Sequence, residues 1–346
     1  MAGTIQQIAQ LAGVSRGTVD RALNHRGRIA PDTAAEIERI AKELDYVPKR
    51  GRGSGSSPAV RKVGERKIGV ITQLSGASFM IEVHKGLHAA SDELESRDIR
   101  VLMRESEGVD EEEQLRQMEE LLEEGIDALA IMPVSSESIR QKLNQLSGQG
   151  IPVITFNSDI AGADRLCFVG LDNRRSGCTA AGLMGMMAGG GGKVLVITGS
   201  FSNEAGSRRV DGFVETLKED FPGMELVGVQ SSADRTQEVE RIILQTMAVY
   251  PELKGIFVTS GGQAGIADAF RQLCPARKPF VIAYDLTPKN ARFLHDGTID
   301  LLIDQECYVQ GYRAVLLLAD KLSRGREPEQ PLMYTDISIR TKYNIY

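Results

Sequence analysis

Histidine and cysteine side chains, which most often serve as metal ligands or nucleophiles, are few in this sequence and do not cluster. His84 and His88 have the i, i+4 spacing of two ligands on one helix, but the intervening residues lack the glutamate of a zinc protease. The four cysteines form no CxxC pair and are expected to be buried free thiols: Cys167, Cys178, Cys274 and Cys307. The sequence therefore predicts no metal, no cofactor and no enzymatic activity.

A glycine run at residues 189–192, followed by Lys193, is the remaining candidate for chemistry on a phosphate. It lacks the GxxxxGK(S/T) spacing of a phosphate loop, and it precedes a strand-like segment instead of opening a helix. We therefore expect a turn here. The chemistry left to the chain is recognition through charge and hydrogen bonds.

Charge is distributed unevenly along the chain. Residues 1–67 carry 13 Lys and Arg against 7 Asp and Glu, a charge of +6, so the remaining residues hold −12 of the total of −6. A compact basic module on an acidic body is typical of a nucleic-acid-binding head, because Lys and Arg neutralise phosphates. No apolar run approaches the roughly 18 to 20 residues of a membrane span. The N-terminus has no secretory signal pattern, so we expect a cytoplasmic protein without a membrane partner.

The basic segment has the pattern of three short helices. Apolar residues recur at helical spacing in residues 5–12, then Gly13 allows a tight turn and Ser15 can cap a second helix that ends near residue 23. A third amphipathic helix fits residues 31–44, with Pro31 in its first turn. Two helices joined by a four-residue turn can place the second helix in the DNA major groove.

The residues of this segment are familiar. The sequence TIQQIAQLAGVSRGTVDRALN, followed by APDTAAEIERIAKELDYVP, resembles the headpiece of the lactose-repressor family. By that resemblance the DNA contacts are base-reading positions at Arg16, Gly17 and Arg21 and further positions at Thr4, Ser15, Thr18, Asn24 and Arg28. An arginine can donate two hydrogen bonds to guanine, whereas Gly17 allows close approach. Asp20 departs from the expected pattern and is assigned to orienting Arg16 or Arg21; the alternative for both arginines is a solvated helix surface.

Residues 49–67 are rich in Gly, Ser and basic charge and predict a flexible linker. In the family this segment carries a hinge helix that inserts a leucine into the minor groove. This chain has no Leu between Val47 and Ile68, so we treat it as a degenerate hinge and expect weaker operator bending.

From about residue 68 onward, strand-like apolar runs alternate with amphipathic helices, which predicts a parallel α/β fold. The expected strands lie at residues 67–72, 98–104, 128–132, 153–156, 193–198, 226–230, 255–259, 280–284 and 299–304. About 280 residues of this kind fit two lobes with a cleft at the carboxyl ends of the strands. The predicted architecture is therefore a headpiece at residues 1–48, the linker at residues 49–67 and a two-lobed domain at residues 68–346. Lobe 1 is assigned to residues 68–160 and 300–328, and lobe 2 to residues 161–299 and 329–346.

This two-lobed stretch resembles the ligand-binding domain of the same family and, through it, the periplasmic sugar-binding proteins, particularly the ribose-binding kind. The resemblance implies ligand contacts at Phe79, Asn157, Asp159, Arg209, Arg235, Ser260, Asp285 and Gln305. Carboxylates, amides and a guanidinium match sugar hydroxyls, and an aromatic ring can cover the apolar ring face. Asp172 and Asn173 are interpreted as helix-cap or turn residues. Arg208, Arg209 and Arg235 leave open a phosphorylated or acidic sugar beside the neutral one.

The predicted function is a homodimeric, sugar-responsive transcriptional repressor that binds a near-palindromic operator, since one recognition helix reads few base pairs. The alternative is a transport-type sugar-binding protein.

Overall fold

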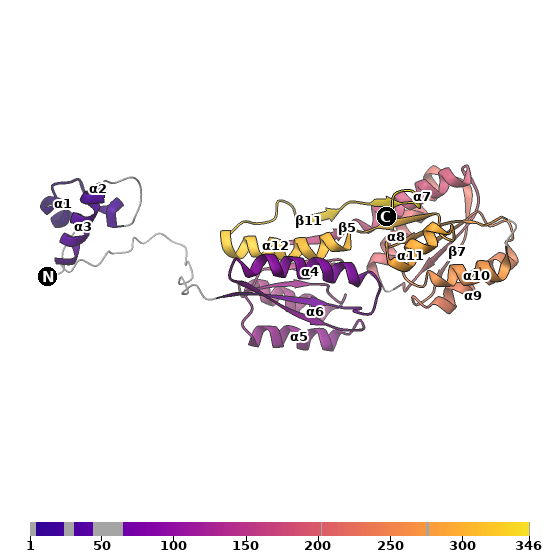
Figure 1. The fold of residues 1–346 in the computed structure, drawn as a ribbon, viewed down its shortest axis with the longest axis horizontal. Coiled ribbons are helices and arrows are strands. Elements are labelled where there is room, and N and C mark those ends of the chain that lie inside the picture. The colour runs from indigo at the N-terminus through magenta and orange to yellow at the C-terminus, as the bar shows by residue number, and fades with distance from the viewer. Residues whose placement is uncertain (1–4, 24–30, 44–64, 202, 275–276, 346) are drawn as a thin grey trace. The chain divides into compact units, whose positions relative to one another are not determined.

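The computed structural model describes residues 5–23, 31–43, 65–201, 203–274 and 277–345 (Figure 1). The chain divides into two compact units, Met1–Lys62 and Val63–Tyr346. Of the predicted linker at residues 49–67, residues 49–64 lie outside the described part.

The first unit contains helices α1 (Ile5–Leu11), α2 (Arg16–Leu23) and α3 (Pro31–Glu43). Gly13 has a φ of +62°, so the turn between α1 and α2 uses the left-handed conformation that glycine adopts readily. Ser15 caps α2, because its Oγ accepts a hydrogen bond from the Thr18 backbone N–H at 3.1 Å. The predicted helices are thus confirmed, and they close a small core of Ile8, Ala9, Val19, Ala22, Ile37, Ile40 and Ala41.

The second unit is built on two six-stranded sheets, and each sheet forms the centre of one lobe. In lobe 1 the strand order is β11-β5-β4-β3-β1-β2, and every neighbouring pair is parallel. Its strands are β1 (Arg66–Thr72), β2 (Ile99–Glu105), β3 (Ala128–Ile131), β4 (Val153–Phe156), β5 (Cys167–Leu171) and β11 (Leu332–Thr335).

Helices cover both faces of the lobe 1 sheet, as the alternating pattern predicted. Helices α4 (Met80–Glu95) and α12 (Cys307–Arg324) pack together on one face, where Leu87 and Leu318 join the same core cluster as Ile68. Helices α5 (Glu111–Glu123) and α6 (Glu137–Gly148) cover the other face, where Leu121 and Leu143 pack with Ile71.

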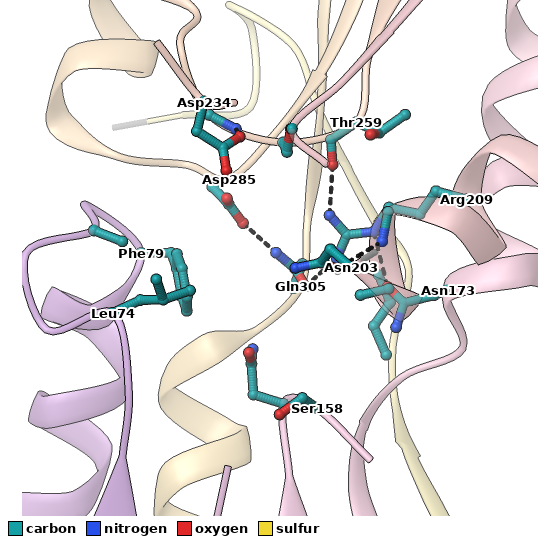
Figure 2. Close-up of a pocket in the computed structure, with 18 of the residues that line it drawn as sticks. Leu74, Phe79, Ser158, Asn173, Asn203, Arg209, Asp234, Thr259, Asp285 and Gln305 are labelled. Atoms are coloured by element: carbon teal, nitrogen blue, oxygen red, sulfur yellow. Dashed lines mark hydrogen bonds between the residues drawn. The ribbon is translucent and has the colours of Figure 1, made fainter. Parts of the chain in front are cut away.

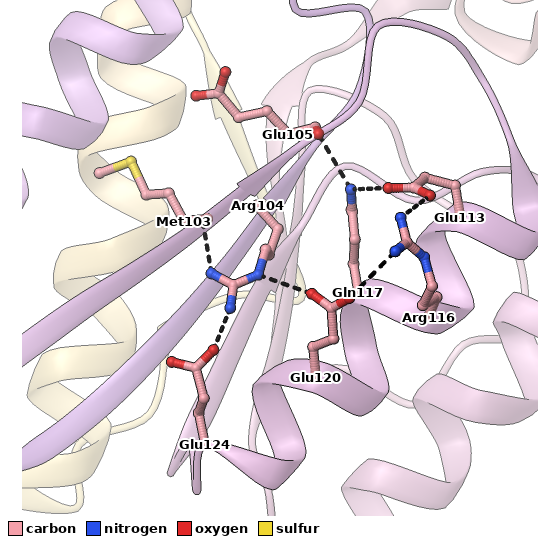
Figure 3. Close-up of polar contacts among 8 residues, drawn as sticks. All are labelled: Met103, Arg104, Glu105, Glu113, Arg116, Gln117, Glu120 and Glu124. Atoms are coloured by element: carbon pink, nitrogen blue, oxygen red, sulfur yellow. Dashed lines mark hydrogen bonds and ion pairs between the residues drawn. The ribbon is translucent and has the colours of Figure 1, made fainter.

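The edge strand β2 is tied to α5 by charged side chains, as Figure 3 shows. Arg104 on β2 donates to Glu120 of α5 at 3.2 Å and also pairs with Glu124. Gln117 of α5 donates in turn to the carbonyl of Glu105 at 3.2 Å. Charged side chains on an edge strand oppose pairing with another chain. This network therefore protects the outer edge of lobe 1 from pairing with another chain.

Lobe 2 has the strand order β12-β10-β9-β8-β6-β7, and only its edge strand β12 is antiparallel. Its strands are β6 (Gly191–Thr198), β7 (Gly223–Ser231), β8 (Gly255–Val258), β9 (Phe280–Tyr284), β10 (Leu301–Asp304) and β12 (Ser338–Arg340). Its helices are α7 (Asn173–Ala188), α8 (Glu204–Asp220), α9 (Thr236–Val249), α10 (Ala264–Leu273) and α11 (Pro288–His295). Helices α7 and α8 share one core cluster with the sheet, while α9, α10 and α11 share the other.

The structure corrects the predicted lobe boundaries. Strand β5 pairs with β4, so lobe 1 continues to residue 171 instead of ending at residue 160. Strand β10 pairs with β9 and so belongs to lobe 2, and β11 pairs with β5 and so belongs to lobe 1. In the described part, the chain therefore passes between the lobes after β5, after β10 and between β11 and β12. Hydrogen-bonded pairing decides where a strand belongs, and an apolar pattern alone does not reveal it.

Candidate functional site

A cleft of ≈ 800 Å³ lies where loops of the two lobes face each other (Figure 2). Lobe 1 contributes the loops after β1, β3 and β4, and lobe 2 contributes the loops after β6, β7, β8 and β9. These are the carboxyl ends of parallel strands, the usual ligand site of open α/β sheets. The volume fits a small ligand, since such sites measure about 300–1,000 Å³.

Arg209 of α8 is the central side chain of the cleft and is only 7% exposed. Its Nε donates to Asn173 Oδ1 at 2.8 Å, its Nη1 to the carbonyl of Thr259 at 2.7 Å, and its Nη2 to Gln305 Oε1 at 2.7 Å. The guanidinium also lies 3.9 Å from the centre of the Tyr284 ring. Contacts on three edges and one face fix its orientation before any ligand arrives.

The Tyr284 ring packs against one face of the Arg209 guanidinium. It is fully buried, and its hydroxyl lies 2.6 Å from Ser176 Oγ of α7. Burial raises the pKa of Tyr284 to about 12, so the phenol stays neutral near pH 7. The ring therefore presents an uncharged π face to the guanidinium, the geometry of a cation–π contact.

A close helix crossing sets the position of α8. A Cβ built on Gly177 of α7 would lie 2.1 Å from the Arg209 carbonyl oxygen, and one built on Gly212 of α8 would lie 2.1 Å from the carbonyl oxygen of Arg174. Only glycine allows two backbones this close. The two glycines therefore bring the start of α8, and Arg209 with it, to the cleft.

Gln305 links Arg209 to the carboxylate of Asp285 through hydrogen bonds. While its Oε1 accepts from Arg209, its Nε2 donates to Asp285 Oδ1. Burial raises the pKa of the Asp285 carboxyl above its ordinary value, and the Arg209 guanidinium opposes that rise. Arginine, amide and carboxylate form one chain across the lobe 2 side of the cleft (Figure 2).

Left-handed backbone conformations gather around the cleft. Positive φ values occur just after β1, β4, β7, β9 and β10, at Leu74, Asn157, Ala233, Asp234, Asp285 and Glu306. Such conformations are costly for residues other than glycine, and Asn and Asp tolerate them best. The strand ends are therefore bent sharply where they meet the cleft.

Asp234 lines the cleft, and sequence reasoning missed it. Its Oδ1 accepts from the Gly261 backbone N–H at 2.8 Å. A Cβ built on Gly199 would lie 2.4 Å from that same oxygen, so the carboxylate fills space that glycine leaves. The sequence does hold a signal for this site: small residues follow β6 and β8, and an acidic residue follows β7.

Arg235 was the wrong prediction at this turn. Its side chain is 66% exposed, lies 3.6 Å from Glu238 and is not among the residues that line the cleft. The left-handed conformations of Ala233 and Asp234 turn the chain so that Asp234 lines the cleft in place of its neighbour.

The lobe 1 wall combines an aromatic ring with amides. Phe79 immediately precedes α4 and lines the cleft from lobe 1, below Asp285 in Figure 2. Asn157 donates to Gln310 Oε1 of α12 at 3.0 Å. Gln73 is 6% exposed; its Nε2 lies 3.4 Å from the carbonyl oxygen of Pro133, and its Oε1 has no hydrogen-bond partner among the described residues. This wall therefore offers an apolar surface, Phe79, beside a buried acceptor, Gln73 Oε1, that has no donor among the described residues.

Seven of the eight predicted ligand residues line the cleft: Phe79, Asn157, Asp159, Arg209, Ser260, Asp285 and Gln305. Asp159 is already committed, because it accepts from Thr155 at 2.7 Å and pairs with Arg165. Asp172 caps α7 by accepting from the Arg175 N–H, as predicted. Asn173 was wrongly interpreted as a cap or turn residue, since it lines the cleft and holds Arg209.

In the first unit, Arg16 is exposed at the start of α2. Ser15 Oγ and Thr18 Oγ1 lie 2.9 Å apart beside it, and Gly17 and Arg21 belong to the same helix. Thr4, Asn24 and Arg28, which the sequence also assigned to DNA contacts, lie outside the described residues.

Among the residues described, no group of three or more His, Cys, Asp or Glu has the placement to hold a metal ion. Likewise, no helix in the described ranges has the length and apolar character to cross a membrane.

Comparison with known proteins gives two family matches: bacterial regulatory proteins, lacI family, over residues 4–49, and periplasmic binding protein domain over residues 68–327. The ribose operon repressor of Bacillus subtilis is 23% identical over 343 residues, which covers 98% of this chain and 96% of the relative. The D-ribose/D-allose-binding protein of Pseudomonas aeruginosa is 24% identical and covers 76% of this chain and 84% of the relative. An arabinose-binding protein from Geobacillus stearothermophilus has a similar structure, with a TM-score of 0.70, 25% identity, and coverage of 81% of this chain and 98% of that chain.

Proposed function

Because the chain belongs to the lacI family of bacterial regulatory proteins and carries a periplasmic binding protein domain, we propose that a sugar-like polyol in its cleft controls its repression of transcription. The headpiece at residues 1–48 binds operator DNA, residues 49–67 form the linker, and residues 68–346 bind the effector. Such a regulator acts in the cytoplasm, where its operator lies.

The observation that carries this proposal is the chain from Arg209 through Gln305 to Asp285 in a cleft of ≈ 800 Å³. Sugar hydroxyls both donate and accept, so they need carboxylate and amide partners of fixed orientation. Phe79 supplies an apolar surface for the opposite face of a sugar ring. Seven of the eight ligand positions assigned from the sequence are therefore retained in the proposal, Asp234 takes the place of Arg235, and Asn173 is a supporting residue.

An anionic sugar has less support than the sequence alone suggested. Arg235 does not line the cleft, and Arg208 is bound to Glu204 at 2.7 Å. All three nitrogens of Arg209 already donate to protein acceptors. Lys289, the remaining cation of the described lining, is exposed, so solvent screens its charge, and the proposed effector carries no anionic group.

Gln305 also connects the ligand to the segments that join the lobes. It follows β10, where the chain crosses from lobe 2 to lobe 1, and its carbonyl accepts from Gln310 at 2.8 Å and from Thr335 at 3.0 Å. A ligand acts only through its different affinities for two arrangements of the lobes. We propose that contact at Gln305 favours one arrangement and thereby releases the operator.

The proposed DNA-binding form is a homodimer on a near-palindromic operator. One recognition helix reads few base pairs, and two linked heads gain affinity by binding two half-sites at once. The contacts are assigned to Arg16, Gly17 and Arg21 for bases and to Thr4, Ser15, Thr18, Asn24 and Arg28 for further positions. We assign no catalytic activity to the chain.

Selection of random duplex DNA with the purified full chain tests the proposal against the transport-type alternative. We expect an enriched inverted repeat, bound by a dimer in analytical ultracentrifugation and released by a polyol. The repressor relative aligned over 98% of this chain supports that result. A selection that enriched no repeat would contradict a regulator.

A further inference from the structure

The lobe 2 side of the cleft carries an unbalanced charge. Apart from two ion pairs, the described lining holds three carboxylates, Asp172, Asp234 and Asp285, and two cations, Arg209 and Lys289, which leaves a charge of −1 when all five are ionised. The two ion pairs are Asp159 with Arg165 and Glu204 with Arg208. Asp172 also caps α7, and Asp234 and Lys289 are both exposed, where solvent screens their charges. The inner cleft therefore favours a positive group in its ligand.

Many hydrogen-bond donors of the cleft already have an acceptor in the protein, whereas Asn173 Nδ2, Asn203 Nδ2 and Ser260 Oγ have none among the described residues. The three nitrogens of Arg209 and the amide nitrogens of Gln305, Asn157 and Asn290 all donate to protein oxygens. Each of these groups thus has at least one partner inside the protein.

Acceptors, by contrast, remain free on both walls. Asp234 and Asp285 each use Oδ1, and within the described residues neither Oδ2 has a hydrogen-bond partner. On lobe 1 the buried Gln73 Oε1 also lacks a partner in the described part. Leaving a buried acceptor unsatisfied is costly, so a ligand that donates to it gains affinity.

Resting on the proposed function, we propose that the effector is an amino-substituted polyol whose protonated amine binds between Asp234 and Asp285. An ammonium group provides up to three N–H donors and the charge of +1 that the inner cleft lacks. The hydroxyl groups of the polyol meet Gln73 and the amides, and its apolar face lies on Phe79. Asp234 then distinguishes the amine from a hydroxyl at the same position.

The Asp234 carboxylate is held in place by neighbouring backbone groups, so it can distinguish an amine from a hydroxyl. Glycines at positions 199 and 261 leave the space that its carboxylate fills, and the Gly261 N–H holds Oδ1 at 2.8 Å. This backbone hydrogen bond fixes the orientation of the carboxylate and, with it, the position of the free Oδ2. The substitution Asp234→Asn keeps an acceptor for that N–H, and asparagine tolerates the φ of +57° found here. It removes the charge and changes little else.

Isothermal titration calorimetry on the full chain at pH 7 tests the inference with matched pairs: glucosamine and glucose, galactosamine and galactose, and an amino-inositol and inositol. We expect the amino member of at least one pair to bind at least about tenfold more tightly than its hydroxyl parent, the strength of one charge-assisted hydrogen bond. Asp234→Asn should abolish that preference. Asp211→Asn, an exposed change of the same charge on α8, should retain it.

The outcomes separate this inference from the function beneath it. If, in every pair that binds, the hydroxyl parent binds as tightly as its amino partner or more tightly, the amine assignment is overturned and the polyol-controlled repressor stands. If Asp234→Asn keeps the amine preference, the role of Asp234 is overturned. If neither member of any pair binds, the polyol effector itself is rejected.

Discussion

Arg209 reaches Asp285 through the side chain of Gln305, which accepts a hydrogen bond from the first and donates one to the second. The amide thereby holds a cation and an anion in the same cleft without letting them neutralise each other directly. Among the described residues, the Asp285 carboxylate uses only Oδ1 and so keeps Oδ2 for a ligand group. Five predictions follow from this arrangement and from the headpiece.

Arg209→Lys should weaken polyol binding at least about tenfold and lower the free energy of unfolding by about 1–3 kcal/mol. A lysine keeps the charge but cannot serve Asn173, Thr259 and Gln305 together. Calorimetry and urea unfolding measure the two effects. Arg208→Lys is the control, because this neighbour is exposed and pairs only with Glu204. Equal behaviour of the two variants would contradict the central role of Arg209.

Asp285→Asn should bind polyol poorly yet be more stable than the wild type at pH 7. Because burial raises the pKa of Asp285, its ionisation near neutral pH costs stability that asparagine does not lose. The stability advantage of the variant over the wild type should therefore shrink as pH falls through the raised pKa of Asp285 toward the ordinary value of about 3.9, because the wild-type carboxyl then becomes neutral. Urea unfolding at pH 7 and pH 5 measures it. An advantage that grew on acidification would be the wrong sign.

Gly177→Ala should lower the free energy of unfolding by about 1–3 kcal/mol, since its Cβ would lie 2.1 Å from the Arg209 carbonyl oxygen. We also expect weaker polyol binding, because α8 must move. Gly182→Ala on the same helix is the matched control: no atom lies within 4 Å of its Cβ. That variant should be neutral or slightly stabilised, given the better helix propensity of alanine. Thermal unfolding compares the pair.

Arg16→Ala should cost about 1–3 kcal/mol of discrimination at one base pair of each half-site. Fluorescence anisotropy with the selected operator and its single-base variants measures this loss. Lys42→Ala, an exposed change on α3, should leave base preference unaltered. Unchanged affinity and preference in Arg16→Ala would remove it from the base-reading positions.

The linker should bend the operator less than a leucine-inserting hinge does. No leucine stands between Val47 and Ile68, so the side chain that acts as a wedge between base steps is missing. Circular-permutation gel shifts measure the bend angle. A strong kink at the centre of the operator would show that another side chain takes this role.

The sequence predicted most elements of the fold because most of them repeat a simple pattern. A buried parallel strand reads as a short apolar run, and the following helix reads as an amphipathic stripe, so nine of the strands were placed close to their observed bounds. Strand β5 was missed because no helix separates it from β4. Strands β11 and β12 were missed because they are short edge strands near the end of the chain, with few buried positions.

The cleft was predictable as a set of residue types but not in its local geometry. Polar residues after strand ends were found because carboxyl ends of parallel strands meet at one edge. The choice between Asp234 and Arg235 depended on two consecutive left-handed residues, which no spacing rule reveals. Asn173 resembled a helix cap because it follows the true cap, Asp172, and only the packing of α7 against α8 directs it to Arg209.

The passage of the chain between the lobes has a consequence for synthesis on the ribosome. Strands β11 and β12 complete the edges of two different sheets, yet they lie within nine residues of each other, at Leu332–Arg340. Neither lobe can therefore form its full set of strand pairs until these last residues have left the exit tunnel. A nascent chain stalled before residue 332 would leave β5 and β10 as edge strands, and unprotected edges promote aggregation. Premature termination at this point should thus yield chaperone-bound or degraded product rather than a repressor with a single damaged lobe.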